Sequence, residues 1–352
     1  MSHPGHPWPP RSGNPAEATF AAVGHAHPHQ LVMARGLIQA GARCRWVWDA
    51  DPRCAQDLAE ALPGSTVARS LDEVLDDPSL SLVCGVVPPA ERAALGLRVL
   101  ASGKDYLAAK PGLITREELA QVRLAVQQTG RRYLVFFSER FQSPATARAE
   151  DLVRQGAIGT VHHLVGLGPH RLGGPRPSWF YDRQRSGGII NDLGSHQIDQ
   201  FLVFTASTTA HCVSARVQVR PEPGTGHAFQ HLGEAHLVAP TGASGYFRVD
   251  WHSPAGLPTW GDSRTFLTGS AGSIEIRRTI DPGRGGAQVI LVDQRGVVQE
   301  ACASLPPHPF LRDLVADLVQ GTATALDQEH VLRVMDLCLD AQAQADEIAS
   351  AR

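Results

Sequence analysis

Residues 19–29 read TFAAVGHAHPH, an apolar run that ends in a glycine-containing turn. The run has the length of a buried strand, and the residues after Gly24 lead into an amphipathic helical pattern. Short apolar runs and amphipathic helical stretches then alternate as far as residue 137. Alternation of this kind predicts a parallel sheet with right-handed helical crossovers, that is, a doubly wound α/β domain.

The strands expected in this part cover residues 19–23, 43–48, 80–87, 106–109 and 133–137, and the helices cover 30–40, 52–62, 90–102 and 116–129. Beyond residue 141 the pattern changes, because strand-like runs follow one another without intervening helices. These runs cover residues 161–166, 211–219, 235–238, 245–251, 264–269, 273–277 and 288–292, with helices expected at 145–155, 192–204, 309–320 and 328–348. Strands in succession imply a second, α+β domain with a mostly antiparallel open sheet.

The two patterns set the expected domain boundaries. We expect the doubly wound domain over residues 18–139 and the α+β domain, closed by C-terminal helices, over residues 140–352. Residues 1–17 are rich in Pro, His and Gly and lack the apolar core of a signal peptide. They are therefore expected to form a disordered tail.

Composition excludes several classes of partner. Of the 352 residues, 43% are hydrophobic and 19% are charged, as is usual for a globular enzyme. The 32 basic and 35 acidic residues give a net charge of only −3 without a basic stripe, so nucleic acid is not an expected partner. No apolar run approaches the length that spans a membrane. The six cysteines lack CxxC spacing, which favours reduced thiols in a cytoplasmic protein over disulfides or a zinc site.

The turn after the first strand is a candidate dinucleotide site, because a pyrophosphate binds there at a helix N-terminus in doubly wound sheets. The usual G-x-G-x-x-G reads here GHAHPH, residues 24–29, in which Gly24 is kept and Ala26 is a small substitute for the second glycine. His25 and His27 are expected to contact phosphate or solvent rather than a metal, because a turn that opens a helix splays alternate side chains.

A carboxylate after the second strand bears on the choice of cofactor. Asp49 stands where an acidic residue binds the ribose 2′-hydroxyl, and its charge would repel a 2′-phosphate. NAD is therefore favoured over NADP. The alternative is that Asp49 caps the following helix, a role that Asp51 could take instead.

Residues 187–199 read GGIINDLGSHQID and carry the candidate acid–base chemistry. Asp192, His196 and Asp199 are spaced four and then three residues apart, so a helix would stack them on one face. A histidine between carboxylates is suited to proton transfer. The alternatives are that Asp192 caps a helix, that His196 is a core histidine and that Asp199 is structural.

Lys110 is the other candidate catalytic residue. It precedes Pro111 and follows the fifth expected strand, so it should point into the crevice at the carboxyl ends of the parallel strands. The alternative is a surface lysine beside a loop proline.

Together these segments resemble the Gfo/Idh/MocA family of glucose-fructose oxidoreductase, inositol 2-dehydrogenase and other sugar dehydrogenases. Lys110-Pro111 resembles the family's E-K-P segment, and residues 187–199 resemble its G-G-x-x-x-D-x-G-x-H-x-x-D segment. Residues 87–89, 101–104 and 156–159 resemble further family segments in the right order. One departure is that Ala109 stands where the family has Glu.

The resemblance implies a Rossmann domain, a C-terminal α/β domain with an open sheet, and hydride transfer between NAD(P) and a sugar, sugar acid or cyclitol hydroxyl. It implies that His196 is the general acid/base, that Lys110 binds the reacting hydroxyl, and that Asp192 orients the substrate or the histidine. Pro88, Pro89 and Lys110 would lie at the cofactor. The resemblance also points to a homodimer or homotetramer.

Residues 177–183, PSWFYDR, suggest how a carbohydrate-like substrate could be held. Trp179 could stack on a sugar and Arg183 could bind a carboxylate or phosphate, although the segment could equally be a packed loop. Two other functions stay open at this point. One is a glycoside hydrolase or lyase that uses NAD transiently, and the other is a non-catalytic ligand-binding relative with an altered cofactor turn.

Overall fold

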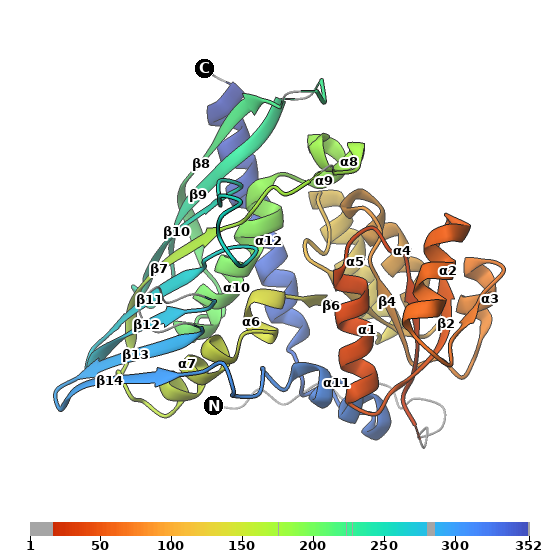
Figure 1. The fold of residues 1–352 in the computed structure, drawn as a ribbon, viewed down its shortest axis with the longest axis horizontal. Coiled ribbons are helices and arrows are strands. Elements are labelled where there is room, and N and C mark those ends of the chain that lie inside the picture. Colours follow the sequence, from red (N-terminus) through yellow and green to blue (C-terminus); the bar gives the residue numbers. More distant parts are fainter. Residues whose placement is uncertain (1–16, 175, 223, 227, 280–285, 351–352) are drawn as a thin grey trace. The chain divides into compact units, whose positions relative to one another are not determined.

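The computed structural model describes residues 17–350 except 175, 223, 227 and 280–285. The tail expected at residues 1–17 therefore lies outside the described residues but for Glu17. The chain forms two compact units (Figure 1). The first comprises Met1–Leu113, Glu117–Phe136 and Pro309–Leu332, and the second comprises Ile114–Arg116, Phe137–His308 and Arg333–Arg352.

The first unit contains a 6-stranded sheet in the order β3-β2-β1-β4-β5-β6, with every pair parallel. The strands are β1 (Thr19–Val23), β2 (Arg43–Trp48), β3 (Thr66–Val67), β4 (Leu82–Gly85), β5 (Asp105–Ala109) and β6 (Tyr133–Phe136). The helices are α1 (His29–Gln39), α2 (Pro52–Ala61), α3 (Leu71–Asp76), α4 (Pro89–Ala101), α5 (Arg116–Thr129) and α11 (Phe310–Gln320). This strand order confirms the doubly wound prediction, and it places a reversal of strand order between β1 and β4.

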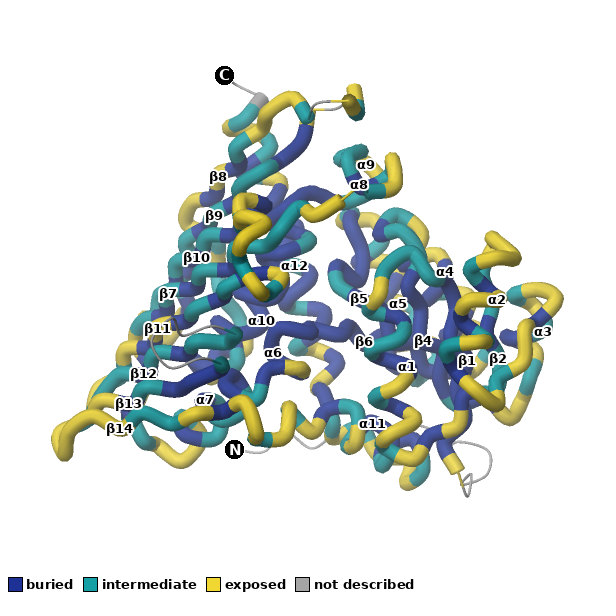
Figure 2. The backbone as a smooth tube through the Cα atoms, in the orientation of Figure 1, coloured by how far each residue is buried: buried dark blue, intermediate teal, exposed yellow. Residues whose placement is uncertain are grey.

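The burial of four strands explains why their sequences are continuous apolar runs. Every residue of β1, β4, β5 and β6 is buried (Figure 2), because helices cover both faces of a parallel sheet. The short edge strand β3 is exposed and was not expected from the sequence.

Helix α11 belongs to the first unit, whereas we expected all of residues 140–352 to lie in the second domain. The reason lies in its packing against α1 and β6. The Phe310 ring lies 6.2 Å from that of Phe136, and Leu311 fills the space beside Gly36, where a Cβ would come within 2.3 Å of it. A helix joins the unit that buries its apolar face, whatever its place in the sequence.

A buried ion-pair cluster ties α11 to the amino-terminal ends of β5 and β6. The Arg132 guanidinium lies 2.7 Å from the Asp105 carboxylate and 2.9 Å from that of Asp317, with all three side chains at most 4% exposed. Asp317 also accepts hydrogen bonds from Thr322 Oγ1 at 2.6 Å and from the Ala325 N–H at 2.9 Å. Because the ion pair and these hydrogen bonds all favour the ionised carboxylate, Asp317 should stabilise the fold in its charged form.

Replacement of Asp317 is expected to destabilise the first unit in a pH-dependent way. Burial acts to raise the pKa of Asp317, but hydrogen bonds from Thr322, Ala325 and Thr324 outweigh it and lower the pKa from 3.8. The stabilisation is therefore complete above the ordinary pKa and is lost as pH falls through the lowered pKa of the folded state. At pH 7, Asp317→Asn should lower the free energy of unfolding by about 3 kcal/mol, near the low end for a broken buried ion pair because Arg132 keeps a second carboxylate.

Urea unfolding from pH 7 down to pH 3 measures this difference. The gap between wild type and Asp317→Asn should shrink once the pH falls below the ordinary pKa of an aspartate. Asp313→Asn, on the exposed side of the same helix, is the matched control and should change little. A gap that is the same at every pH would contradict a role for the charged carboxylate.

The second unit contains an 8-stranded sheet in the order β14-β13-β12-β11-β7-β10-β9-β8. Its strands are β7 (Val161–Pro169), β8 (His211–Pro221), β9 (Ala228–Val238), β10 (Ser244–Asp250), β11 (Arg264–Gly269), β12 (Gly272–Arg277), β13 (Gln288–Asp293) and β14 (Gly296–Ala301). Among the strands that the structure describes, the β7–β10 pair alone is parallel, which confirms the mostly antiparallel prediction. Strand β14 was not expected.

The remaining helices follow β6 along the chain. They are α6 (Ser138–Phe141), α7 (Pro144–Arg154), α8 (Ser178–Tyr181), α9 (Arg183–Ser186), the π-helical turn η1 (Ile190–Gly194), α10 (Ser195–Phe204) and α12 (Gln328–Ser350). Helix α7 contacts β12 and β13, α10 contacts β7, and the π-helical turn η1 contacts β9 and β10. Burial alternates along β7, β9 and β11, as expected for a sheet with one covered face (Figure 2). Among the described residues, no helix is long and apolar enough to cross a membrane.

Candidate functional site

The turn between β1 and α1 lies at the reversal of strand order in the first unit. Gly24 has φ +80°, and a Cβ on it would come within 2.7 Å of Val87 Cγ1 and 2.8 Å of the Val86 carbonyl oxygen. The Ala26 N–H donates to the same Val86 oxygen at 2.9 Å. The glycine is therefore required by both conformation and space, and the turn lies directly against the segment that follows β4.

Asp49 links the end of β2 to this turn. Its Oδ2 accepts a hydrogen bond from the His25 N–H at 2.6 Å, and its Oδ1 accepts one from the Asp51 N–H at 2.8 Å. Helix α2 is capped instead by Asp51, whose side chain accepts from the Arg53 N–H. The half-buried Asp49 is thus held at the carboxyl end of β2 by two N–H groups and does not cap α2.

The histidines of the turn occupy different positions. His27 Nδ1 accepts a hydrogen bond from the His29 N–H at 3.2 Å, and the two rings pack edge to face with centroids 4.2 Å apart. The buried His25 Nδ1 has no hydrogen-bond partner among the described residues. Across all the residues that the structure describes, no group of three or more His, Cys, Asp or Glu side chains is arranged to hold a metal ion.

Lys110 follows β5 directly, between a buried Ala109 and a cis peptide bond to Pro111. It is half-buried at the carboxyl edge of the sheet, where ligands bind in doubly wound domains. Pro88 and Pro89 begin α4 after the neighbouring strand β4, with Pro88 as its N-cap residue and Pro89 as its first residue. The structure therefore brings the predicted residues of the first unit to one edge of one sheet.

In the second unit the GGIINDLGSHQID segment begins with a π-helical turn rather than an ordinary helix. Ile189 and Ile190 donate their N–H groups to the Oε1 atoms of Gln230 and Gln342, each at 2.9 Å. A Cβ on Gly188 would lie 2.4 Å from Gln342 Oε1, so only glycine leaves room here for the glutamine side chains. Side chains from β9 and α12 thus satisfy the first amides of the segment, and π-helical turns occur frequently at functional sites.

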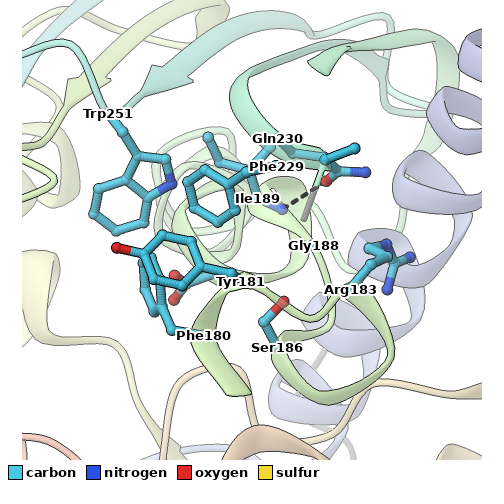
Figure 3. Close-up of a pocket in the computed structure, with 11 residues that line it drawn as sticks. Phe180, Tyr181, Arg183, Ser186, Gly188, Ile189, Phe229, Gln230 and Trp251 are labelled. Carbon is cyan, nitrogen blue, oxygen red and sulfur yellow. Dashed lines mark hydrogen bonds between the residues drawn. The ribbon is translucent and has the colours of Figure 1, made fainter. Parts of the chain in front are cut away.

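Asp192 lies within this π-helical turn, and Ile189 is its N-cap residue, so Asp192 is not a cap. Asp192 lines a pocket of about 340 Å³, open mouth included. The lining residues are Phe180, Tyr181, Arg183, Ser186, Gly188, Ile189, Asp192, Ala228, Phe229, Gln230 and Trp251. Figure 3 shows the rings of Trp251, Phe180, Tyr181 and Phe229 gathered on one side of the pocket, with Arg183 on the other.

The predicted pocket residues are found in different places. Arg183 lines the pocket, and its Nη2 lies 2.5 Å from the Asp346 carboxylate of α12. Trp179 packs edge to face on Phe180, 6.1 Å between ring centroids, and is absent from the pocket lining found among the described residues. Its neighbours in α8 supply aromatic surface in its place.

His196 and Asp199 lie on α10 and are both buried. Asp199 accepts hydrogen bonds from Arg140 Nε at 2.8 Å and from Nη2 at 3.0 Å, a two-pronged ion pair that joins α10 to α6. This pairing favours the structural interpretation of Asp199. His196, one turn after Asp192 along the chain, is 1% exposed.

Sequence reasoning missed Phe229, Gln230, Trp251 and Gln342. They come from β9, the segment after β10, and α12, far from residues 187–199 along the chain. Phe229 and Gln230 lie in a stretch that was not expected to be strand at all, since only residues 235–238 had a strand-like pattern. No local signal marked these four residues.

The residues of the first unit fit a dinucleotide. Gly24 allows the close main-chain approach that a pyrophosphate needs, the Asp49 carboxylate is fixed at the end of β2 by two N–H groups, and the buried His25 Nδ1 has no hydrogen-bond partner among the described residues. The departures from G-x-G-x-x-G leave this dinucleotide cradle, formed by Gly24, His25 and Asp49, in place. Ala26 occupies the second glycine position, and its N–H donates a hydrogen bond to the Val86 carbonyl oxygen.

Comparison with known proteins agrees with this geometry. Residues 19–137 match the sequence model of the GFO/IDH/MocA oxidoreductase family with an NAD-binding Rossmann fold, and residues 146–275 match the model of the GFO/IDH/MocA C-terminal domain. A crystal structure of a candidate oxidoreductase from Erwinia carotovora atroseptica SCRI1043 is 38% identical, with a TM-score of 0.90 over 94% of this chain and 99% of that one.

More distant relatives are named for particular reactions. Levoglucosan dehydrogenase, solved with NADH and levoglucosan, shares the fold at 16% identity, with a TM-score of 0.80 over 94% of this chain and 98% of that one. The scyllo-inositol 2-dehydrogenase (NADP(+)) of Bacillus subtilis is 24% identical over 178 residues, 50% of this chain and 49% of the relative. The chain spans about half the length of the curated relatives it matches. With two family models covering most of its length and a 38% identical structure aligned end to end, the chain belongs to the Gfo/Idh/MocA family of NAD-binding oxidoreductases.

Proposed function

We propose that the protein transfers hydride between NAD and the hydroxyl-bearing carbon of a sugar, sugar acid or cyclitol. The observation that carries this proposal is the pocket of the second unit, where the Asp192 carboxylate shares a cavity with four aromatic rings. Apolar ring faces bind the C–H faces of a carbohydrate, and a few polar groups select its hydroxyls. The dehydrogenase and sugar names of several relatives support the same substrate class.

The roles of the residues follow from the reaction. Hydride leaves a carbon only as the attached hydroxyl loses its proton, so a base must accept that proton. His196 takes this role, and the Asp192 carboxylate orients the substrate or the imidazole. The Lys110 ammonium stabilises the negative charge that develops on the hydroxyl oxygen. The nicotinamide, when bound, supplies the hydride acceptor.

NAD rather than NADP is proposed because Asp49 is ionisable, half-buried and fixed by two backbone N–H groups at the end of β2. A carboxylate held there can accept hydrogen bonds from a ribose and repels a 2′-phosphate. Because the Bacillus subtilis relative is named for NADP(+), the test compares both dinucleotides.

The test is NADH formation across a panel of polyols, sugars, sugar acids and cyclitols, together with thermal-shift titrations of NAD and NADP. A bound cofactor stabilises the folded state, so NAD should raise the unfolding temperature. Dehydrogenation of at least one panel member is expected. NAD-dependent cleavage of a glycoside without net NADH would favour the hydrolase or lyase alternative, and no shift with either dinucleotide would favour a non-catalytic protein.

A further inference from the structure

Arg92 is a buried arginine in the first turns of α4, and its guanidinium contacts main-chain carbonyl groups. It is 3% exposed. Its Nε donates to the Val87 oxygen at 2.8 Å. Its Nη1 lies 3.1 Å from the Ala109 oxygen, 2.5 Å from the Lys110 oxygen and 2.8 Å from the Pro111 oxygen. A single side chain thus holds the segment after β4 and the segment after β5.

These carbonyl groups lie where the sheet can no longer pair them. Strand β5 ends at Ala109, so the oxygens from Ala109 to Pro111 need donors from elsewhere. The planar guanidinium carries its N–H donors in a fixed fork, whereas a lysine ammonium would act as a point charge. The residue type therefore matches the need to hold several carbonyl oxygens at once.

The two segments that Arg92 joins both border the candidate cofactor crevice. Val87 lies against Gly24 of the dinucleotide turn, and Lys110 is the proposed ammonium group. The sheet pairs β4 with β5 only as far as Gly85 and Ala108, and beyond that point the Arg92 side chain bridges the main chain at Val87 and at Lys110. A shift of about 1 Å in such a group can cost roughly 10²-fold in rate.

We infer that Arg92 is a positioning residue that fixes the main chain of Lys110 relative to the cofactor crevice. The inference rests on the proposed function, because it assigns Arg92 a catalytic effect only through Lys110. Arg92 itself is not proposed to touch the substrate or the cofactor.

The test compares Arg92→Met, which keeps the length of the side chain and removes its donors, with Arg92→Lys, which keeps the charge. Arg98→Met is the matched control, because Arg98 lies on the same helix with its side chain 50% exposed in an ion pair with Asp72. Arg92→Met should lower kcat for hydride transfer by about 10²-fold. The KM for NAD should change little, Arg92→Lys should recover part of the loss, and Arg98→Met should behave as wild type.

A second measurement does not depend on activity. The chain contains only two lysines, and Lys104 is buried, with its Nζ donating to the carbonyl oxygens of Leu75 and Ser102. Acylation by an amine-specific reagent, followed by peptide mass spectrometry, therefore reports on Lys110. Release of its main chain in Arg92→Met should make acylation of Lys110 several-fold faster than in wild type and in Arg98→Met.

A double-mutant cycle with Lys110→Met separates positioning from a general structural role. If Arg92 acts through Lys110, Arg92→Met should lower kcat little further in the Lys110→Met background. An equal loss in both backgrounds, or an unchanged acylation rate in folded Arg92→Met, would overturn the inference. Full turnover by Lys110→Met alone would overturn the proposed role of Lys110, and the acylation rate would still decide whether Arg92 holds that segment. Should Arg92→Met fail to fold, Arg92→Lys carries the same expectations with smaller effects.

Discussion

His196→Ala is expected to lower kcat/KM for the best substrate of the panel by about 10²- to 10⁴-fold, the range that general acid–base catalysis contributes. Without the imidazole, no positioned base takes the hydroxyl proton as hydride leaves. Binding of NAD should be unchanged, because the dinucleotide cradle lies in the other unit of the chain. Steady-state kinetics and a thermal-shift titration with NAD measure the two quantities.

A second histidine serves as the control for a nonspecific effect of replacing histidine by alanine. His162 lies on β7 and is exposed, so His162→Ala should retain wild-type turnover. Because His196 is 1% exposed, the unfolding temperature of His196→Ala must also be measured. Normal turnover by a folded His196→Ala protein would remove this residue from the proposed mechanism.

Asp49→Ser is expected to move the preference between NAD and NADP by about 10²- to 10³-fold in the ratio of kcat/KM values. The substitution removes charged hydrogen bonds to the ribose, each worth about 1.5–3 kcal/mol. It also relieves the repulsion of a 2′-phosphate, and together the two effects amount to about 3–4 kcal/mol, where each 1.4 kcal/mol is tenfold. The loss with NAD and the gain with NADP should both be visible.

Asp51→Ser is the matched control for this experiment. Asp51 lies two residues further along the chain and caps α2, a role that serine fills well. The cofactor preference of this variant should equal that of wild type. An unchanged preference in Asp49→Ser would show that Asp49 serves the β1–α1 turn through its bond to the His25 N–H and does not select the cofactor.

Much of the first unit could be predicted because buried parallel strands leave a continuous apolar signal. The expected strands at 19–23 and 43–48 coincide with β1 and β2. The same reasoning missed β3 and α3, which are short, and β14, where the burial pattern is exposed and intermediate throughout. The strands β3 and β14 form because neighbouring strands pair with them, and their own residues carry little buried apolar patterning. Helix α3 has only six residues, although Ser70 caps it and Val74 and Leu75 are buried.

The candidate site, too, could be predicted only in part from the sequence. The spacing of Asp192 and His196 pointed to one helical segment, and both lie there. The π-helical turn around Asp192 was not foreseeable, because it begins where Gln230 and Gln342 accept the first amides. The aromatic residue expected to line the pocket was Trp179, whereas the lining rings come from its neighbours and from distant strands.

The sequence alone therefore predicted four local features: a Rossmann-type alternation, a carboxylate after β2, a lysine after β5 and an Asp–His segment. Each of these depends on periodicity or on neighbours within a few residues. The partners that hold these groups are long-range, as with Arg92 on the carbonyl oxygens around Lys110 and Phe229 and Trp251 beside Asp192. Contacts of this kind depend on which segments fold against each other, and no local pattern in the sequence carries that information.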